Sequence, residues 1–198
     1  MRYTLLLIND GRYEYGWKCL MSALAFLPKP ERIVAIDDDT HELGFAGAIQ
    51  SGWNQILATD TELIFHLEAD FVFERAVDLE AMASLARDPH VSQVALKRQP
   101  WNPQEHEAGG IVELDPAAFE EGQHGGHAYT AHRKFFTTNP SLYRRDIAER
   151  GWPQEDRSEG KFSIDLFEDP HVVSTFWGRK FDPPMVTHIG DMRAGKGY

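Results

Sequence analysis

The chain has 198 residues and a mass of 22.5 kDa, which is enough for one domain with a sizeable core. Twenty basic against 31 acidic residues give a net charge of −11, which disfavours wholesale binding to nucleic acid or anionic membranes because both need summed positive charge. Apolar residues make up 42% and charged residues 26%, as in a globular rather than a disordered protein.

The cysteine count and the N-terminal residues indicate where the protein works. The single cysteine, Cys19, excludes an intrachain disulfide framework and fits a reducing compartment. The apolar run at residues 4–8 is too short for a signal peptide, and no run approaches the roughly 18 apolar residues of a membrane span. We therefore expect a cytoplasmic protein that is neither exported nor membrane-spanning.

Short apolar runs alternate with helical periodicity in the first half of the chain. The runs predict buried strands at residues 5–8, 32–36, 63–67 and 91–96. The spacing between them predicts helices over 13–27, 46–57 and 79–86, with Asp78 as the N-cap of the last. This alternation implies parallel strands with right-handed crossovers, hence a three-layer α/β sheet flanked by helices. The aromatic residues assigned to its core are Trp17, Trp53, Phe65 and Phe71.

The second half loses this alternation. Residues 99–130 are rich in Gly and Pro and are expected to form long loops or a hairpin lying over a site. Beyond them we expect a helix over 142–150, a second helix from about Ser158 to before Asp169, and late strands at 172–177 and 185–189.

Acidic residues follow three of the predicted strands, at the sheet edge where α/β proteins bind ligands. They are Asp10, Asp37 to Asp39, and the Glu68-Ala69-Asp70 triplet. Glu68 and Asp70 lie one residue apart, project to the same side and can share a divalent cation; oxygen ligands suit Mg²⁺ or Mn²⁺, which keep positions for water and phosphate. Asp39-Thr40 is interpreted as the N-cap of the following helix.

The order and spacing of these elements resemble the nucleotide-sugar half of a family-two-type glycosyltransferase of the GT-A fold. The resemblance is strongest over about the first hundred residues, including 33–40 and 63–70, and extends to fainter matches at 138–145, 158–162 and 186–190. It implies a single GT-A-like, Rossmann-like domain over residues 1–198 with a mostly parallel sheet. Residues 1–98 would form the nucleotide-sugar half, and 99–198 the acceptor side with a tail that contacts metal and phosphate.

The resemblance also implies roles for single residues. Asp37 and Asp38 would hold the base and ribose of the donor. Glu68-Ala69-Asp70 matches the Asp-X-Asp metal motif, with Asp70 as the direct ligand and Glu68 making a longer or water-mediated contact. His188 would complete the metal site. Donor contacts are also expected from Ile8, Asn9 and Asp10, although these side chains differ from those usual in the family.

The implied reaction moves a sugar from a nucleoside-diphosphate sugar, with UDP-sugars favoured, to an unidentified acceptor hydroxyl, with Mn²⁺ or Mg²⁺ as cofactor. Glu159 is the predicted general base, with Glu155 and Asp156 as rivals, and a single base implies inversion at the anomeric carbon. The family's usual basic residue is missing from the second helix. Its charge is expected from one of Lys97, Arg98, Arg133, Lys134 and Arg193.

Several alternatives remain open on the sequence alone. A nucleotidyltransferase would share the α/β plan, but residues 8–12 hold a single glycine where a phosphate loop needs several. A catalytically silent nucleotide-sugar binding module would need neither Glu159 nor His188. A zinc site at His124, His127 and His132 is disfavoured because their spacing lacks a tetrahedral framework. A sugar ring could stack on Trp101, Trp152 or Trp177.

Overall fold

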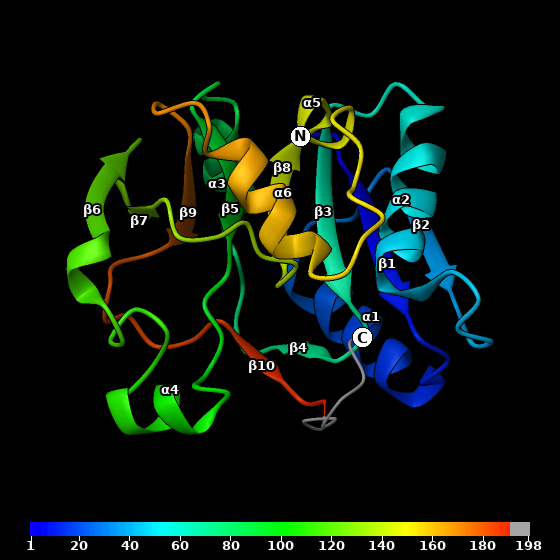
Figure 1. Ribbon diagram of the computed structural model, residues 1–198, viewed down its shortest axis with the longest axis horizontal. Helices are drawn as coiled ribbons and strands as arrows, with labels where there is room; N and C mark the ends of the chain where they lie inside the picture. The colour runs from blue at the N-terminus through cyan, green and yellow to red at the C-terminus, as the bar shows by residue number, and fades with distance from the viewer. Residues whose placement is uncertain (191–198) are drawn as a thin grey trace.

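The computed structural model describes residues 1–190 (Figure 1). Its helices are α1 (Tyr13–Phe26), α2 (Gly44–Leu57), α3 (Leu79–Ala86), α4 (Pro103–Ala108), α5 (Arg145–Ala148) and α6 (Ser158–Leu166), with a 3₁₀ turn at Pro116–Ala118. Its strands are β1 (Thr4–Asn9), β2 (Arg32–Asp37), β3 (Leu63–Glu68), β4 (Phe71–Phe73), β5 (Val91–Ala95), β6 (Phe119–His124), β7 (His127–His132), β8 (Ser141–Arg144), β9 (Val173–Trp177) and β10 (Val186–His188).

Within residues 1–190, eight strands form one sheet in the order β2-β1-β3-β8-β5-β9-β7-β6. β2, β1, β3, β5 and β9 run in the same direction, whereas β8 and β7 run against them. The mostly parallel α/β sheet predicted from the sequence is therefore confirmed. Its carboxyl edge carries a second, two-stranded sheet of β4 and β10, which lies below the large sheet in Figure 1.

Alternate side chains of the central strands face opposite layers. Leu5 and Leu7 of β1 belong to one core with α1 and α3, whereas Leu6 and Ile8 belong to a second core with α2, α5 and α6. Figure 1 shows α6 in front of the sheet and α3 behind it. Helices on both faces explain why these strands are apolar throughout rather than alternating with polar residues.

The predicted helix over 142–150 is wrong in its first part. Ser141–Arg144 is a strand, β8, which pairs antiparallel with both β3 and β5, and only Arg145–Ala148 is helical. Burial in the middle of the sheet decides this, because Leu142 and Tyr143 are fully buried and cover opposite faces. Local apolar spacing cannot reveal such a tertiary effect.

The assignment of Trp17 to the core is also wrong, because 64% of this side chain is exposed. The buried positions of α1 are small, namely Gly16, Cys19 and Ala23, and Trp17 lies on the opposite, exposed side of this helix. Trp53, Phe65 and Phe71 are buried as predicted.

The Gly- and Pro-rich segment contains α4 and the β6–β7 hairpin, which closes one edge of the sheet. A hairpin is therefore present in this segment, as the outer pair of strands of the large sheet. Among the described residues, no helix has both the length and the apolar character needed to span a lipid bilayer.

Candidate functional site

Asp70 lies just beyond the end of β3, and its carboxylate meets side chains from two other segments. Arg12 Nη2 donates to Asp70 Oδ2 over 2.9 Å, and His188 Nε2 lies 3.4 Å from the same oxygen. Burial alone would raise the pKa of Asp70, but the hydrogen bonds and charges of His188 and Arg12 outweigh it and hold the pKa below its ordinary value. Asp70 is therefore ionised at neutral pH, as a cation ligand must be.

His188 is held in place through its backbone and its ring. The Gln99 side-chain amide donates to the His188 carbonyl and accepts from its backbone N–H, both at 2.8 Å. The imidazole lies edge-on to Phe71 and Trp101, with ring centroids 4.8 and 3.8 Å away. Because β10 pairs with β4, His188 stands directly opposite Phe71, the residue that follows Asp70.

Gly190 packs directly against the Asp70 carboxylate. A Cβ at this glycine would lie 2.3 Å from Asp70 Oδ2, closer than real atoms approach. The neighbouring Ile189 N–H donates to the Asp70 carbonyl over 2.7 Å, which fixes the close approach. A glycine is required here for space, and sequence reasoning placed no constraint on this position.

Arg12 is a cationic residue of the site that sequence reasoning did not propose. Its Nε donates to Asp10 Oδ1 over 2.6 Å while its Nη2 reaches Asp70, so one guanidinium bridges two carboxylates. Gly11, with φ of +83°, makes the turn from β1 that presents Arg12, and a Cβ there would meet Asp39 Cα at 2.8 Å. The signal available in the sequence was Asp10-Gly11-Arg12 itself, a charged turn at a strand end.

Of the five cationic residues that the sequence suggested for this charge, Arg98, Arg133 and Lys134 line a cavity that also includes Glu159. Lys97 is buried and donates to the carbonyls of Arg179, Lys180 and Asp182. Arg98 forms a bidentate ion pair with Glu105, in which Nη1 and Nη2 each donate to one carboxylate oxygen. Arg193 lies outside the described residues.

The residues around Asp70 are suited to a divalent cation with two protein ligands. Within residues 1–190, Asp70 Oδ1 and His188 Nδ1 are buried without a hydrogen-bond partner, and the same part of the chain holds no cluster of three or more His, Cys, Asp or Glu side chains that could bind a metal. One carboxylate and one imidazole fit Mn²⁺ or Mg²⁺ whose other positions hold water and phosphate.

Glu68 is half-buried and close to other carboxylates. Burial raises its pKa well above the usual value, and the charges of Asp70 and Glu159 raise it further. The pKa values of the two acidic residues of the triplet are therefore shifted in opposite directions, that of Asp70 down and that of Glu68 up.

The acidic residues after β1 and β2 have unequal positions. Asp37 is exposed and accepts from Asn9 Nδ2 over 2.9 Å. Asp38 is buried and accepts from the backbone N–H groups of Leu43 and Gly44 at 3.1 and 2.8 Å, at the first residues of α2. The expected cap, Asp39-Thr40, is thus wrong by one residue, because Asp38 performs this role.

The remaining residues predicted to contact the donor lie close by. Asn9 and Asp10 are largely buried at the end of β1. Ile8, Asp10, Arg12, Phe45, Glu68, Ala69 and Asp70 line one small cavity.

Glu159 lies in the first turn of α6 and points toward the sheet. Its Oε1 accepts from the backbone N–H of Thr138 over 3.0 Å, and burial raises its pKa. The rival bases Glu155 and Asp156 are exposed in the loop before α6. A partly desolvated carboxyl with a raised pKa is suited to proton transfer near neutral pH.

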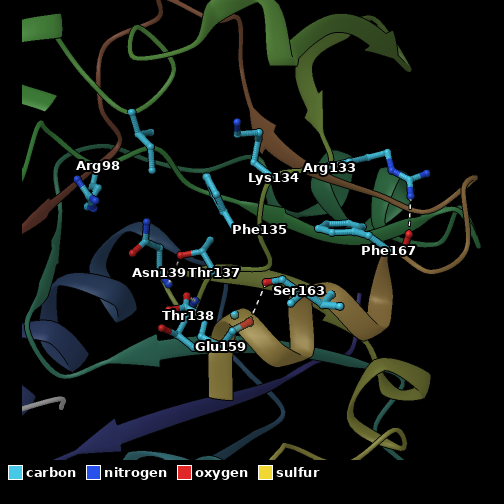
Figure 2. A pocket seen from close by; sticks show the side chains of 13 residues that line it. Arg98, Arg133, Lys134, Phe135, Thr137, Thr138, Asn139, Glu159, Ser163 and Phe167 are labelled. Carbon is cyan, nitrogen blue, oxygen red and sulfur yellow. Dashed lines mark hydrogen bonds between the residues drawn. The ribbon is translucent and has the colours of Figure 1, made fainter. Parts of the chain in front are cut away.

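Two large cavities adjoin at Glu159 and Thr138, which line both. One, of about 710 Å³, runs along α6 and is lined by Arg98, Lys134 and Arg133, with Phe135 and Phe167 between them (Figure 2). The other, of about 640 Å³, lies toward the start of α2 and includes Glu68. Glu68 also lines the small cavity at Asp70, so the three cavities are neighbours that share lining residues.

The two large cavities differ in charge. The cavity of Figure 2 has three cationic side chains and one carboxylate, Glu159. Its neighbour has a single cation, Arg157, among four carboxylates, which are Glu68, Glu155, Asp156 and Glu159. Two of the three cations of the first cavity are themselves paired, Arg98 with Glu105 and Lys134 with Asp115.

The histidines weighed as a zinc site are not gathered. His124 contacts Ser84, His127 faces Asp78, and His132 packs among aromatic rings, where burial lowers its pKa to about 3. Of the three candidate stacking tryptophans, Trp152 and Trp177 are buried, whereas Trp101 is half-buried against His188.

No protein-family model matches this sequence, and no curated protein does either. Solved structures match it by fold. A fragment of S. aureus TarS in complex with UDP-GlcNAc superposes with a TM-score of 0.62 and 14% identity over 99% of this chain and 60% of that one. The mannosyltransferase PcManGT from Pyrobaculum calidifontis, in complex with GDP-Man and Mn²⁺, gives 0.61 and 13% over 98% of this chain and 58% of that one.

These neighbours are GT-A glycosyltransferases, and the chain has the GT-A fold. At such identities the likeness extends to the fold alone. The chain spans about 60% of the length of each of these structures.

Proposed function

We propose that the protein is a metal-dependent glycosyltransferase that moves a sugar from a nucleoside-diphosphate sugar, with UDP-sugars favoured, to an acceptor hydroxyl with inversion. The observation that carries the proposal is a set of three neighbouring cavities, with Asp70 in the wall of the small one and Glu159 in the walls of both large ones. His188 contacts Asp70 at the same place. A transferase needs this arrangement, because donor and acceptor must meet at one base.

The donor side is assigned to the carboxyl edge of β1, β2 and β3. Asp37 is exposed there and is proposed to contact the ribose or base. Asp38 positions the first residues of α2 at the same edge, because it accepts hydrogen bonds from their backbone N–H groups. Ile8, Asn9, Asp10 and Ala69 complete this wall. GDP-Man with Mn²⁺ and UDP-GlcNAc are the ligands of the two neighbours, which supports a nucleotide-sugar donor for this fold.

Asp70 and His188 are the residues that would hold the cation. A bound Mn²⁺ or Mg²⁺ would offset the negative charge that the diphosphate gains as it leaves. Glu68 lies between this position and Glu159 and, in its protonated form, does not repel a diphosphate.

Glu159 is proposed to take the proton of the acceptor hydroxyl. The Thr138 N–H orients its carboxylate, and its place between the two large cavities lets it reach a group bound in either. Attack by the activated hydroxyl on the anomeric carbon, from the side opposite the diphosphate, inverts the configuration. General-base catalysis of this kind contributes about 10²–10⁴-fold to the rate.

The test measures turnover of a panel of UDP- and GDP-sugars with Mn²⁺ by wild type, Asp70→Ala and Glu159→Gln. We expect metal-dependent release of UDP or GDP by wild type and its loss in Asp70→Ala. Glu159→Gln should lower the rate by about 10²–10⁴-fold while nucleotide binding, followed by calorimetry, stays close to that of wild type.

Exposed carboxylates near the same cavity provide matched controls. Glu155→Gln and Asp156→Asn remove equal charge from the wall but should keep most of the turnover. Equal rates in wild type and Asp70→Ala would contradict the proposal, and a loss of turnover in Asp156→Asn but not in Glu159→Gln would transfer the role of base to Asp156.

A further inference from the structure

The cation that Asp70 contacts within residues 1–190 is the guanidinium of Arg12. The Nη2 of Arg12 is 2.9 Å from Asp70 Oδ2, and its Nε is 2.6 Å from Asp10 Oδ1. The pairs are well shielded, since the exposed side-chain fractions are 20% for Arg12, 10% for Asp70 and 2% for Asp10. Shielded charges interact more strongly than surface charges, so this bridge is a substantial interaction.

His188 approaches the same Asp70 oxygen from the other side, at 3.4 Å. Gly190 closes a third side, where even one added carbon would collide with Asp70 Oδ2. A cation held by His188 Nε2 and the Asp70 carboxylate comes close to Oδ2, the oxygen to which Arg12 donates. Two positive groups at that distance repel each other strongly in a partly buried site.

We propose that Arg12 occupies the cation's place on Asp70 in the metal-free protein, so that the Arg12–Asp70 ion pair and metal binding at Asp70 exclude each other. The inference rests on the proposed function in that Asp70 is taken as a metal ligand. Arg12 then stabilises the clustered carboxylates of Asp10 and Asp70 when no metal is present, and it lowers the affinity of the site for a divalent cation.

The geometry of the first turn of α1 supports this role. Gly11 and Arg12 connect β1 to α1 without a side-chain cap from Arg12, and its guanidinium also lies 5.0 Å from the ring centre of Tyr15. Release from Asp70 therefore leaves Arg12 two remaining contacts, Asp10 and the Tyr15 ring, so the side chain can give up Asp70 without losing every partner.

The experiment titrates Mn²⁺ alone into wild type, Arg12→Gln and Arg12→Lys, with free Mn²⁺ followed by electron paramagnetic resonance. Loss of the competing charge in Arg12→Gln should tighten Mn²⁺ binding by about tenfold, equivalent to ~1.4 kcal/mol. Arg12→Lys keeps the positive charge but lacks the planar guanidinium that bridges two carboxylates. We therefore expect a smaller increase in Mn²⁺ affinity, of about two- to fivefold.

Lys18→Gln is the matched control, because it removes one positive charge from an exposed position on the same helix, where Lys18 pairs with Glu14. It should leave Mn²⁺ affinity within about twofold of wild type, since exposed charges are screened. Adding Asp70→Asn to Arg12→Gln should remove the tight binding, which places the bound Mn²⁺ at Asp70.

Thermal unfolding supplies a second readout. Arg12→Gln removes the charge that Asp10 and Asp70 both contact, so it should melt below wild type without metal and gain more from Mn²⁺ than wild type does. If Arg12→Gln does not fold, the Arg12→Lys titration decides alone.

Unchanged or weaker Mn²⁺ binding in the folded Arg12 variants overturns the inference, and so does tight binding that survives Asp70→Asn. Absence of Mn²⁺ binding in wild type and variants alike overturns both the inference and the metal site of the proposed function. Binding that follows the expected order without sugar transfer would overturn the proposed function alone.

Discussion

Asp70 is the residue with the most demanding surroundings in the candidate site. Its carboxylate meets Arg12, His188 and Gly190, which come from two segments far from Asp70 in the sequence. The sequence predicts Asp70, His188 and Glu159 as functional candidates because each belongs to a local pattern at a strand or helix end. Arg12 and Gly190 were missed because their roles depend on contacts that form only when distant segments fold together.

Glu68 leads to a prediction on pH. Its pKa is raised in the folded chain, so its favourable contribution to stability is present below the ordinary value of 4.5 and is lost as the pH rises through the raised value. Glu68→Gln stays neutral at every pH. It should match wild type in free energy of unfolding near pH 4 and exceed it at pH 8, by an amount within the usual range of about 0.5–3 kcal/mol.

Urea unfolding of both proteins at several pH values measures this difference. Glu120→Gln, at an exposed position of β6, is the control and should change stability little at any pH. A Glu68→Gln protein that is less stable than wild type at pH 8 would show that the ionised carboxylate is stabilised in the folded chain, contrary to our interpretation.

At the scale of elements, the end of β2 determines how α2 begins. Leu43, at the N-cap position of α2, makes no side-chain capping bond. Instead, Asp38 accepts from the Leu43 and Gly44 N–H groups, which lie five and six positions after it. Sequence patterns located α1, α2, α3 and α6 because each has an amphipathic face or a stop signal. They failed at β8, whose strand conformation is decided by pairing with β3 and β5.

The cap at α2 can be tested with two neighbouring substitutions. Asp38→Ala should destabilise the protein by about 0.5–2 kcal/mol, because two N–H groups at the start of α2 lose their acceptor. Asp39→Ala removes the adjacent, exposed carboxylate and should change stability by less than about 0.5 kcal/mol. Chemical denaturation measures both, and equal effects would mean that the cap contributes nothing beyond local charge.

At the scale of the whole molecule, a buried polar network joins the helical layer to the sheet. Tyr143 of β8 accepts from Trp53 Nε1 of α2 over 2.9 Å, and its hydroxyl lies 3.1 Å from His66 Nδ1 of β3. Burial lowers the pKa of His66 to about 3, so this ring stays neutral. The alternation of strands and helices predicted the three layers, but not a polar contact across them, because Tyr143 belongs to the strand that sequence reasoning missed.

Removal of the Tyr143 hydroxyl should therefore weaken the whole fold. Tyr143→Phe leaves Trp53 Nε1 buried without its acceptor, which costs about 1–3 kcal/mol. Tyr13→Phe, on the exposed face of α1, serves as the control and should melt close to wild type. A melting temperature of Tyr143→Phe equal to that of wild type would mean that the network is replaced by other partners.

The place of β8 has a consequence for how the polypeptide reaches its native state during synthesis. β3 and β5 are both complete by residue 95, yet the strand that joins them, Ser141–Arg144, leaves the ribosome much later. Until then each of them exposes an open backbone edge, which invites pairing with other chains. A nascent chain arrested between these points should thus depend on chaperones far more than the finished protein does.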